Sequence, residues 1–307
     1  MGAAGHGHAH SHPSSPRRAL GAALTLTALF SVVEVVVGLW SGSLALLADA
    51  GHMIGDSAAL TLSLVVSVIA SRPRSRSKTY GYRRAEVLGA LINAVGLLVV
   101  AFFIVREAVE RVQHPPAVRG LGMLGTAIGG LAVNLLAAWI LARRGGAGIN
   151  VRGALMHVLG DALGSVAAIV AGVLLVVAGW RIADPIASIV ISVLILYGAL
   201  RLLRETTHVL MEGTPAGLDC AALEATILAT PGVSALHDLH VWALTPGEPM
   251  LTAHVVIDAG AHGTVVAQKV GDRVREAHGI EHVTIQPEPP PAELVVLRLP
   301  PDRQAQS

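Results

Sequence analysis

Six long apolar runs constrain the fold of this chain more than any other feature of its sequence. Each approaches or exceeds the ~20 residues that a helix needs to cross the hydrocarbon core of a bilayer. Inside lipid every backbone polar group needs a partner within its own segment, so such runs form helices. The sequence therefore predicts an α-helical membrane protein with six transmembrane helices, at residues 19–40, 43–70, 85–105, 118–142, 153–180 and 183–203.

The composition agrees with an integral membrane protein. Apolar residues make up 53% of the 307 positions and charged residues only 14%, and the mean hydropathy is +0.62. The formal net charge of +1 provides no field that would attract nucleic acid. The single cysteine, Cys220, excludes an internal disulfide.

The basic residues between the runs predict the orientation of the helices. Cytoplasmic loops carry an excess of Lys and Arg. Thirteen basic residues fall on the side of the bilayer that both ends of the membrane segment share, and four fall on the other. We therefore expect a multi-pass protein of the bacterial inner membrane with both termini in the cytoplasm.

Two matching pairs of polar residues interrupt the second and fifth runs. They are His52 with Asp56 and His157 with Asp161. Residues four apart share one face of a helix, with about 6 Å of rise between them. A carboxylate at bilayer depth costs on the order of 2.5–3.5 kcal/mol even on the lenient insertion scale, so each pair needs a reason to be there.

Binding a dication supplies that reason. Two imidazole nitrogens and two carboxylate oxygens from two helices make a tetrahedral shell that suits Zn²⁺. The alternative is that each pair only joins helices by hydrogen bonds, and two matching pairs disfavour it. In depth the pairs match imperfectly, since His52 lies nine residues beyond Ser43 and His157 four beyond Gly153. Asp49 shares a face with His52 and is expected to guide the ion or contact its ligands.

Other polar residues also lie within the runs. Interhelical hydrogen bonding is the expected role of Asn93, Asn134 and Ser165. Glu34 is harder to assign, and a position near the outer interface would explain it.

The chain is expected to contain four parts. Residues 1–18 form a disordered arm, either a loose metal-collecting tract or a soluble lead-in, with His6, His8, His10 and His12. The transmembrane domain spans 19–204 and a cytoplasmic domain 205–290, and residues 291–307 form a disordered, proline-rich tail.

The cytoplasmic domain is predicted to be a small α+β unit. Its pattern is helix, strand, strand, helix, strand, at 218–229, 233–244, 251–258, 263–277 and 282–286. That order implies one helical layer on a small sheet. Its many histidines favour a second metal site over scattered surface histidines; with two nearby carboxylates they are His237, His240, His254, His262, His278, His282, Asp238 and Glu288.

At these residues the chain resembles the cation diffusion facilitator family, in its zinc-efflux branch, over nearly its whole length. The membrane motifs that carry the resemblance are SLALLADAGHMIGD at 43–56, YGYRRAEVLGALINA at 80–94 and MHVLGDALGSV at 156–166. The cytoplasmic motifs are HDLHVWAL at 237–244, LTAHVVI at 251–257 and HVTIQPE at 282–288.

The resemblance implies a homodimer in the lipid bilayer with one transport site per protomer, formed by His52, Asp56, His157 and Asp161. It implies a ferredoxin-like cytoplasmic domain that dimerises around a regulatory or structural Zn²⁺. By motif position the ligands there are His237, His254 and Glu288, with His240 and His262 as auxiliary candidates.

The expected function is export of Zn²⁺ from the cytoplasm in exchange for H⁺, with Cd²⁺ or Co²⁺ as alternative cargo. Protons compete with metal for imidazole and carboxylate, so proton entry can drive release. Two rivals are an intramembrane metalloenzyme and a membrane metal sensor. Four protein ligands leave no open position for hydrolysis and no HExxH occurs, so we expect no enzyme and no catalytic residues.

Overall fold

The computed structural model describes residues 16–70, 73, 75–144 and 149–290, and the chain divides into two compact units, Met1–Thr207 and His208–Ser307. The expected tail and residues 1–15 of the expected N-terminal arm, with its four histidines, lie outside the described residues. Residues 16–18, which were also assigned to the arm, belong to the first helix. The domain limits expected from the sequence stay predictions.

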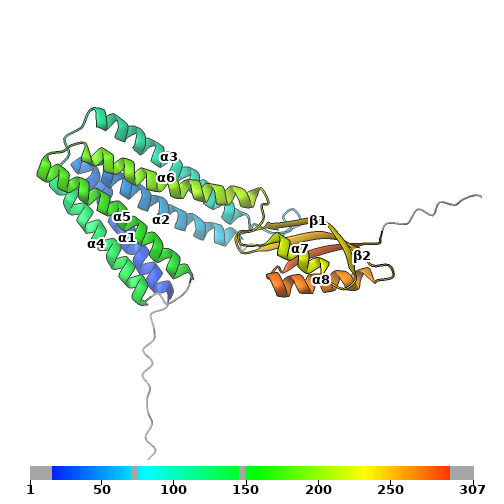
Figure 1. Ribbon diagram of the computed structural model, residues 1–307. Coiled ribbons are helices and arrows are strands. Elements are labelled where there is room, and N and C mark those ends of the chain that lie inside the picture. Colours follow the sequence, from blue (N-terminus) through cyan, green and yellow to red (C-terminus); the bar gives the residue numbers. More distant parts are fainter. Residues whose placement is uncertain (1–15, 71–72, 74, 145–148, 291–307) are drawn as a thin grey trace, which may run out of the picture. The chain divides into compact units, whose positions relative to one another are not determined.

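The first unit consists of six long helices. They are α1 (Pro16–Ser41), α2 (Leu44–Ala70), α3 (Ala85–Gln113), α4 (Gly120–Arg144), α5 (Ile149–Ala178) and α6 (Ala183–Leu210) (Figure 1). Within the described residues, all of these except α2 are long and apolar enough to cross a membrane. The helical membrane domain is therefore confirmed, whereas the crossing by α2 stays a prediction.

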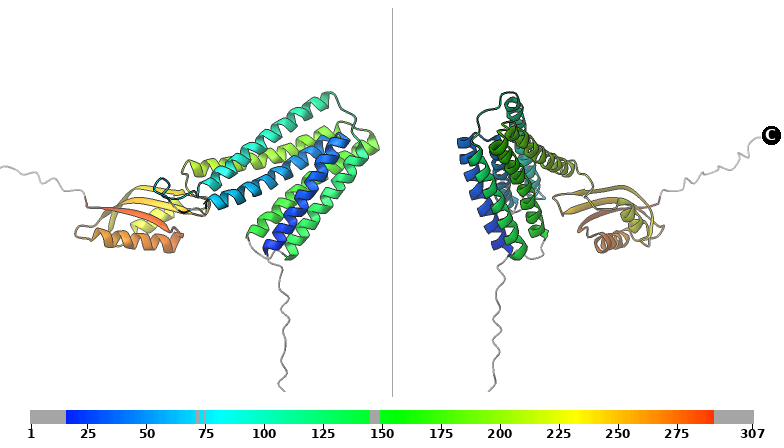
Figure 2. Two further views of the ribbon diagram at one scale, coloured as in Figure 1. Left: turned by 180° about the vertical axis from the view of Figure 1, so that it is seen from behind. Right: turned by 60° about the vertical axis from the view of Figure 1, so that its left-hand side comes forward.

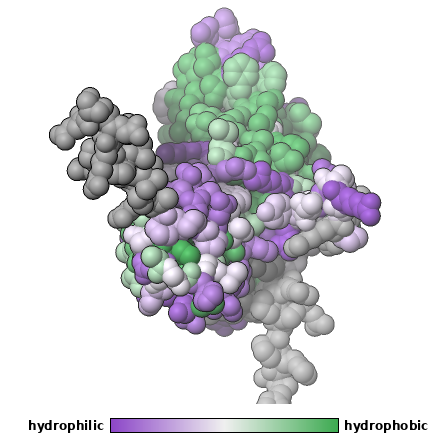
Figure 3. Space-filling view, turned by 90° about the vertical axis from the view of Figure 1, so that its right-hand side faces the viewer, coloured by the Kyte–Doolittle hydropathy of each residue, from purple (hydrophilic) through white to green (hydrophobic). Residues whose placement is uncertain are grey.

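Small residues let the helices approach closely. One buried cluster joins α2 to α6 and contains Ala45, Ala48, Ala127, Ala168 and Ala187. Without large side chains the backbones pack tightly, which is the usual basis of helix association in membranes. In Figure 1 and in both views of Figure 2, α1, α4 and α5 lie side by side, and α2 lies beside α3. The surface of the helices visible in Figure 3 is mostly hydrophobic, as a lipid-facing surface should be.

Two helices continue well beyond the C-terminal ends of their predicted apolar runs. The run expected to end at 105 continues as helix to Gln113, where Arg111 Nε pairs with Glu107 Oε1 at 2.9 Å. The run expected to end at 203 continues to Leu210, where Arg201 pairs with Glu205 at 2.8 Å. Both pairs are spaced i, i+4, which supports helix in a polar segment. Apolar runs therefore predict the spans but not the helix ends.

A buried aspartate from α6 caps the N-terminus of α2. Asp184 is fully buried and accepts hydrogen bonds from Ser43 Oγ at 2.6 Å, Leu44 N at 2.9 Å and Ala45 N at 3.2 Å. It supplies an acceptor for backbone donors that have no partner within α2 and sits where the helix dipole favours negative charge. This contact holds the start of the helix that carries His52 and Asp56.

The second unit has the α-β-β-α-β order predicted from the sequence. Its elements are α7 (Cys220–Leu228), β1 (Val233–Ala243), β2 (Pro249–Ile257), α8 (Gly263–His278) and β3 (His282–Glu288). The sheet order is β1-β2-β3, with β1 antiparallel and β3 parallel to β2. Both helices lie on one face, over a core that includes Leu223, Val255 and Val270. The small α+β domain is confirmed, and its ferredoxin-like assignment stays a prediction.

Candidate metal centres

The first candidate centre joins α2 to α5 by crossed contacts. His52 Nε2 lies 3.3 Å from Asp161 Oδ1, and His157 Nε2 lies 3.0 Å from Asp56 Oδ2. Within each helix, His52 Nε2 lies 3.5 Å from Asp56 Oδ2 and His157 Nε2 lies 3.8 Å from Asp161 Oδ2. Each imidazole therefore faces both carboxylates.

These separations suit a tetrahedral zinc shell. Four ligand bonds of about 2.0–2.2 Å give a tetrahedron whose edges measure about 3.3–3.6 Å. The four nitrogen–oxygen separations lie between 3.0 and 3.8 Å, with Asp161 facing His52 through Oδ1 and His157 through Oδ2. The ligand atoms of His52, Asp56 and Asp161 all lie within 4.8 Å of one another. His157 is not part of that group of three, and its ring centroid lies 5.9 Å from that of His52.

The two histidine–aspartate pairs lie opposite each other, despite the mismatch in depth that the sequence predicted. The helix α5 begins at Ile149, four residues before the predicted run, so His157 is its ninth residue. His52 is the ninth residue of α2, which begins at Leu44. The crossed pairing places the histidine of one helix opposite the aspartate of the other, as in an antiparallel arrangement.

The centre is open at one end and closed at the other. The side chain of His157 is 48% exposed, whereas that of Asp161 is 5% exposed. Oδ2 of Asp56 is buried and, among the described residues, accepts no hydrogen bond of good geometry. Its neighbours are instead the ring nitrogens of His157, at 3.0 Å, and of His52, at 3.5 Å.

Asp49 lies behind this centre and contacts it only indirectly. It is buried, and its Oδ2 accepts a hydrogen bond from Ser165 Oγ at 3.4 Å. The same hydroxyl lies 3.5 Å from the backbone oxygen of Asp161. Asp49 therefore reaches the candidate ligands only through Ser165, and its expected role beside the ion stays a prediction.

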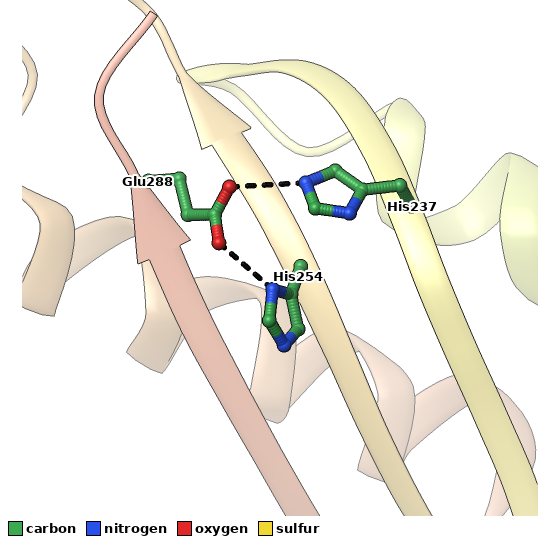
Figure 4. A group of neighbouring side chains, drawn as sticks. All are labelled: His237, His254 and Glu288. Carbon is green, nitrogen blue, oxygen red and sulfur yellow. Dashed lines mark hydrogen bonds and ion pairs between the residues drawn. The ribbon is translucent and has the colours of Figure 1, made fainter.

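The second candidate centre lies on the three-stranded sheet. His237 of β1 pairs directly with His254 of β2, and Glu288 ends β3. Glu288 Oε2 lies 3.0 Å from His237 Nε2, and its Oε1 lies 2.8 Å from His254 Nδ1. Figure 4 shows the carboxylate between the two rings. All three ligand atoms lie within 4.8 Å of one another.

A bulge in β1 shapes this centre. The register shifts between His237 and His240, and Asp238 has a φ of +47°. Aspartate tolerates this left-handed conformation better than most residues, and a bulge re-aims the neighbouring side chains. His240 lies opposite Thr252, and His262 is an exposed residue preceding α8. Within the part of the chain that the structure describes, neither joins the three-residue cluster.

The charges within the second centre reinforce one another. The hydrogen bond to Glu288 raises the pKa of His237, with a smaller contribution from Asp238. Hydrogen bonds from His254 and His237 lower the pKa of Glu288. Two nitrogens and one carboxylate are a donor set that zinc accepts, with room for a further ligand.

Two buried acids have contacts that the sequence analysis did not predict. Asp184 sits at the start of an apolar run, where an aspartate resembles an ordinary helix start. Glu34 is 0% exposed among the helices, and its expected position near the outer interface stays a prediction. The only sequence signal for Glu34 is that its apolar run contains no basic residue that could pair with it.

The comparisons with known proteins cover both units. Residues 20–211 match the family model described as the cation efflux transmembrane domain, and residues 215–290 match the cytoplasmic domain of cation efflux proteins. A Bacillus velezensis protein named as a cadmium, cobalt and zinc/H⁺-K⁺ antiporter is 39% identical, with 92% of each chain covered. The Escherichia coli zinc transporter ZitB is 42% identical, again with 92% of each chain covered.

A solved structure also matches part of the chain. It is titled as the metal-bound C-terminal domain of the CzcD transporter from Cuprividus metallidurans. The two sequences are 44% identical, and the match covers 23% of this chain and 99% of that one, with a TM-score of 0.22.

Proposed function

The chain belongs to the cation diffusion facilitator family, in its zinc-efflux branch, and from that premise we propose that it exports Zn²⁺ in exchange for protons through the centre between α2 and α5. The observation that carries the proposal is the crossed cluster of His52, Asp56, His157 and Asp161, with edges close to those of a zinc tetrahedron. In this account α2 also crosses the membrane, which brings the number of spans to six, and both termini are cytoplasmic.

The chemistry of these ligands couples zinc to protons. Zinc requires neutral imidazole and ionised carboxylate, so each bound ion excludes protons from the same atoms. The ordinary imidazole pKa of about 6.5 puts this competition near physiological pH. The exposed side of His157 is the entrance for zinc in the conformation described, and Asp161 closes the opposite end. Zinc loads from the cytoplasm, the helices expose the site to the outside, and incoming protons release the ion.

Zinc accumulation driven by a pH gradient tests this function. In liposomes containing purified protein and an acidic interior, we expect external zinc to enter against its own gradient as protons leave. A proton ionophore should abolish the accumulation. Parallel assays with cadmium and cobalt, which the name of the Bacillus relative includes, measure the range of cargo. Zinc that binds to the protein but never enters would indicate a sensor and contradict the proposal.

For the cytoplasmic domain we propose a homodimer stabilised by zinc at His237, His254 and Glu288. The arrangement of three donors from three strands supports this role. Zinc bound there when the ion is abundant would favour one arrangement of the dimer and thereby activate transport, since a ligand shifts a population by its differential affinity.

Replacing Glu288 by Gln should weaken zinc binding at the cytoplasmic centre and change its pH dependence. The pKa of His237 is raised by Glu288, so in the native site protons compete with zinc at a higher pH than for a free histidine. Binding should therefore weaken as pH falls through that raised pKa, and the midpoint should move to lower pH in Glu288→Gln. Zinc titrations across pH, in an Asp161→Asn background that removes the membrane centre, measure the shift. An unchanged midpoint would contradict the assignment.

A further inference from the structure

A second polar group lies buried beside the membrane centre. Glu34 of α1 is 0% exposed and Asp49 of α2 is 2% exposed. Ser165 of α5 and Asn134 of α4 are buried with them. Among the described residues, neither oxygen of Glu34 receives a hydrogen bond from any donor, and the side-chain oxygen of Asn134 has none either.

Ser165 connects these residues to one another and to the zinc ligands. Its hydroxyl lies 3.4 Å from Asp49 Oδ2 and 3.5 Å from the backbone oxygen of Asp161, and it accepts a bond from Asn134 Nδ2 at 3.4 Å. A Cβ placed on Gly130 would lie 2.9 Å from Glu34 Oε1 and 3.3 Å from Ser165 Oγ. Glu34 and Ser165 therefore border the same point, which the absence of a side chain at Gly130 keeps free.

The charges of this region do not balance in the zinc-free protein. Residues 19–71, 120–142 and 153–180 contain no Lys or Arg. Without zinc, Glu34 and Asp49 therefore share this region with two further carboxylates, Asp56 and Asp161. Four neighbouring carboxylates are too costly to keep ionised together inside a membrane domain. In the zinc-free state, Glu34 or Asp49 therefore needs a cation of its own.

The donor atoms and the packing both favour a proton as that cation. The group offers only oxygen atoms, whereas zinc prefers sites that include nitrogen or sulfur. A larger hard ion needs about six or more oxygen ligands. One oxygen of each acid instead packs against a glycine of a neighbouring helix, since a Cβ on Gly164 would lie 2.8 Å from Asp49 Oδ1 and one on Gly130 2.9 Å from Glu34 Oε1. Ser165 links the two acids, because its hydroxyl bonds to Asp49 Oδ2 at 3.4 Å and borders the same point beside Gly130 as Glu34 Oε1.

We propose that Glu34, paired with Asp49, is a proton-binding site separate from the zinc ligands and coupled to them by charge. The inference rests on the proposed zinc/proton exchange. The groups that face the pair are Asp161 and His52, while α4 contributes the uncharged Asn134. When zinc binds at Asp161, its positive charge expels the proton from the carboxyl O–H to water. When zinc leaves, the uncompensated carboxylates take a proton up again.

Counting protons per zinc tests the proposal. Purified full-length protein is titrated with zinc, and released protons are measured by calorimetry in buffers that differ in ionisation enthalpy. We expect Glu34→Gln to release about one proton fewer per bound zinc than the wild type, because metal binding displaces protons from the groups it excludes. Glu34→Asp keeps a carboxylate and should restore the count. Glu110→Gln, which removes an exposed carboxylate from α3, should leave it unchanged.

Three results would overturn the proposal. An unchanged count in Glu34→Gln would remove Glu34 from proton binding. A wild-type count that changes when potassium replaces choline in the buffer would assign the pair to an alkali ion instead. If wild-type liposomes also move no zinc under a pH gradient, the proposed zinc/proton exchange itself is wrong. If they do transport zinc and the proton count is unchanged in Glu34→Gln, only the Glu34 site is excluded.

Discussion

Zinc uptake into everted membrane vesicles should fall by at least about 100-fold when Asp161 is replaced by Asn, because ligand support alone is worth 10–100-fold in metal affinity. Asp161 is the most buried of the four ligands and contacts His52 at 3.3 Å. Asparagine keeps the shape of the side chain but lacks the charge that offsets a dication. Zinc-dependent proton flux should disappear together with zinc uptake.

The matched control is Asp258→Asn, the same exchange at an exposed position of the second unit. It should transport zinc at the wild-type rate, which separates loss of a ligand from loss of any carboxylate. Wild-type uptake and proton flux in Asp161→Asn would remove Asp161 from the transport site.

Replacing Asp184 by Ala should destabilise the protein by about 3–5 kcal/mol, as expected when a buried charged acceptor is removed and its donors stay buried. Ser43 Oγ, Leu44 N and Ala45 N would all lose their acceptor. For a protein of this size, that loss lowers the melting temperature by roughly 10 °C. Thermal unfolding in detergent, followed by circular dichroism, measures the effect.

Two variants distinguish the cap from a general packing effect. Ser43→Ala removes one donor and leaves the carboxylate bound to both backbone groups, so it should cost only about 1 kcal/mol. Asp184→Asn retains a carbonyl acceptor and should fall between the two. If Asp184→Ala melts within a few degrees of the wild type, the cap does not hold the start of α2.

Local periodicity was sufficient to predict the membrane cluster. Spacing of i, i+4 places His52 with Asp56 and His157 with Asp161 on one face of each helix, whatever the rest of the fold does. In the cytoplasmic unit, the family resemblance indicated His254 and Glu288, and the parallel pairing of β2 with β3 brings these two residues together on one face of the sheet. The spacing within one helix therefore predicts which side chains lie together, whereas their roles as metal ligands stay predictions.

Residues whose contacts come from distant parts of the chain were not predicted from the sequence. Asp184 caps a helix that begins 140 residues earlier in the chain, and no local pattern reports that contact. Glu34 differs from an ordinary polar residue only because the helices bury it completely, near Ser165 of α5. Helix ends were also missed, because α3 and α6 continue through charged segments that hydropathy does not register as helix.

The coordination of zinc in the membrane tests the central claim most directly. X-ray absorption spectroscopy is applied to protein in which His237 and His254 are replaced by Ala, which removes the cytoplasmic centre, and residues 1–15 are deleted, which removes the four histidines of the N-terminal arm. The account predicts one zinc per chain with two nitrogen and two oxygen ligands at about 2.0–2.2 Å. The Asp161→Asn variant should no longer bind this ion. A six-coordinate all-oxygen shell, or zinc retained unchanged in Asp161→Asn, would contradict it.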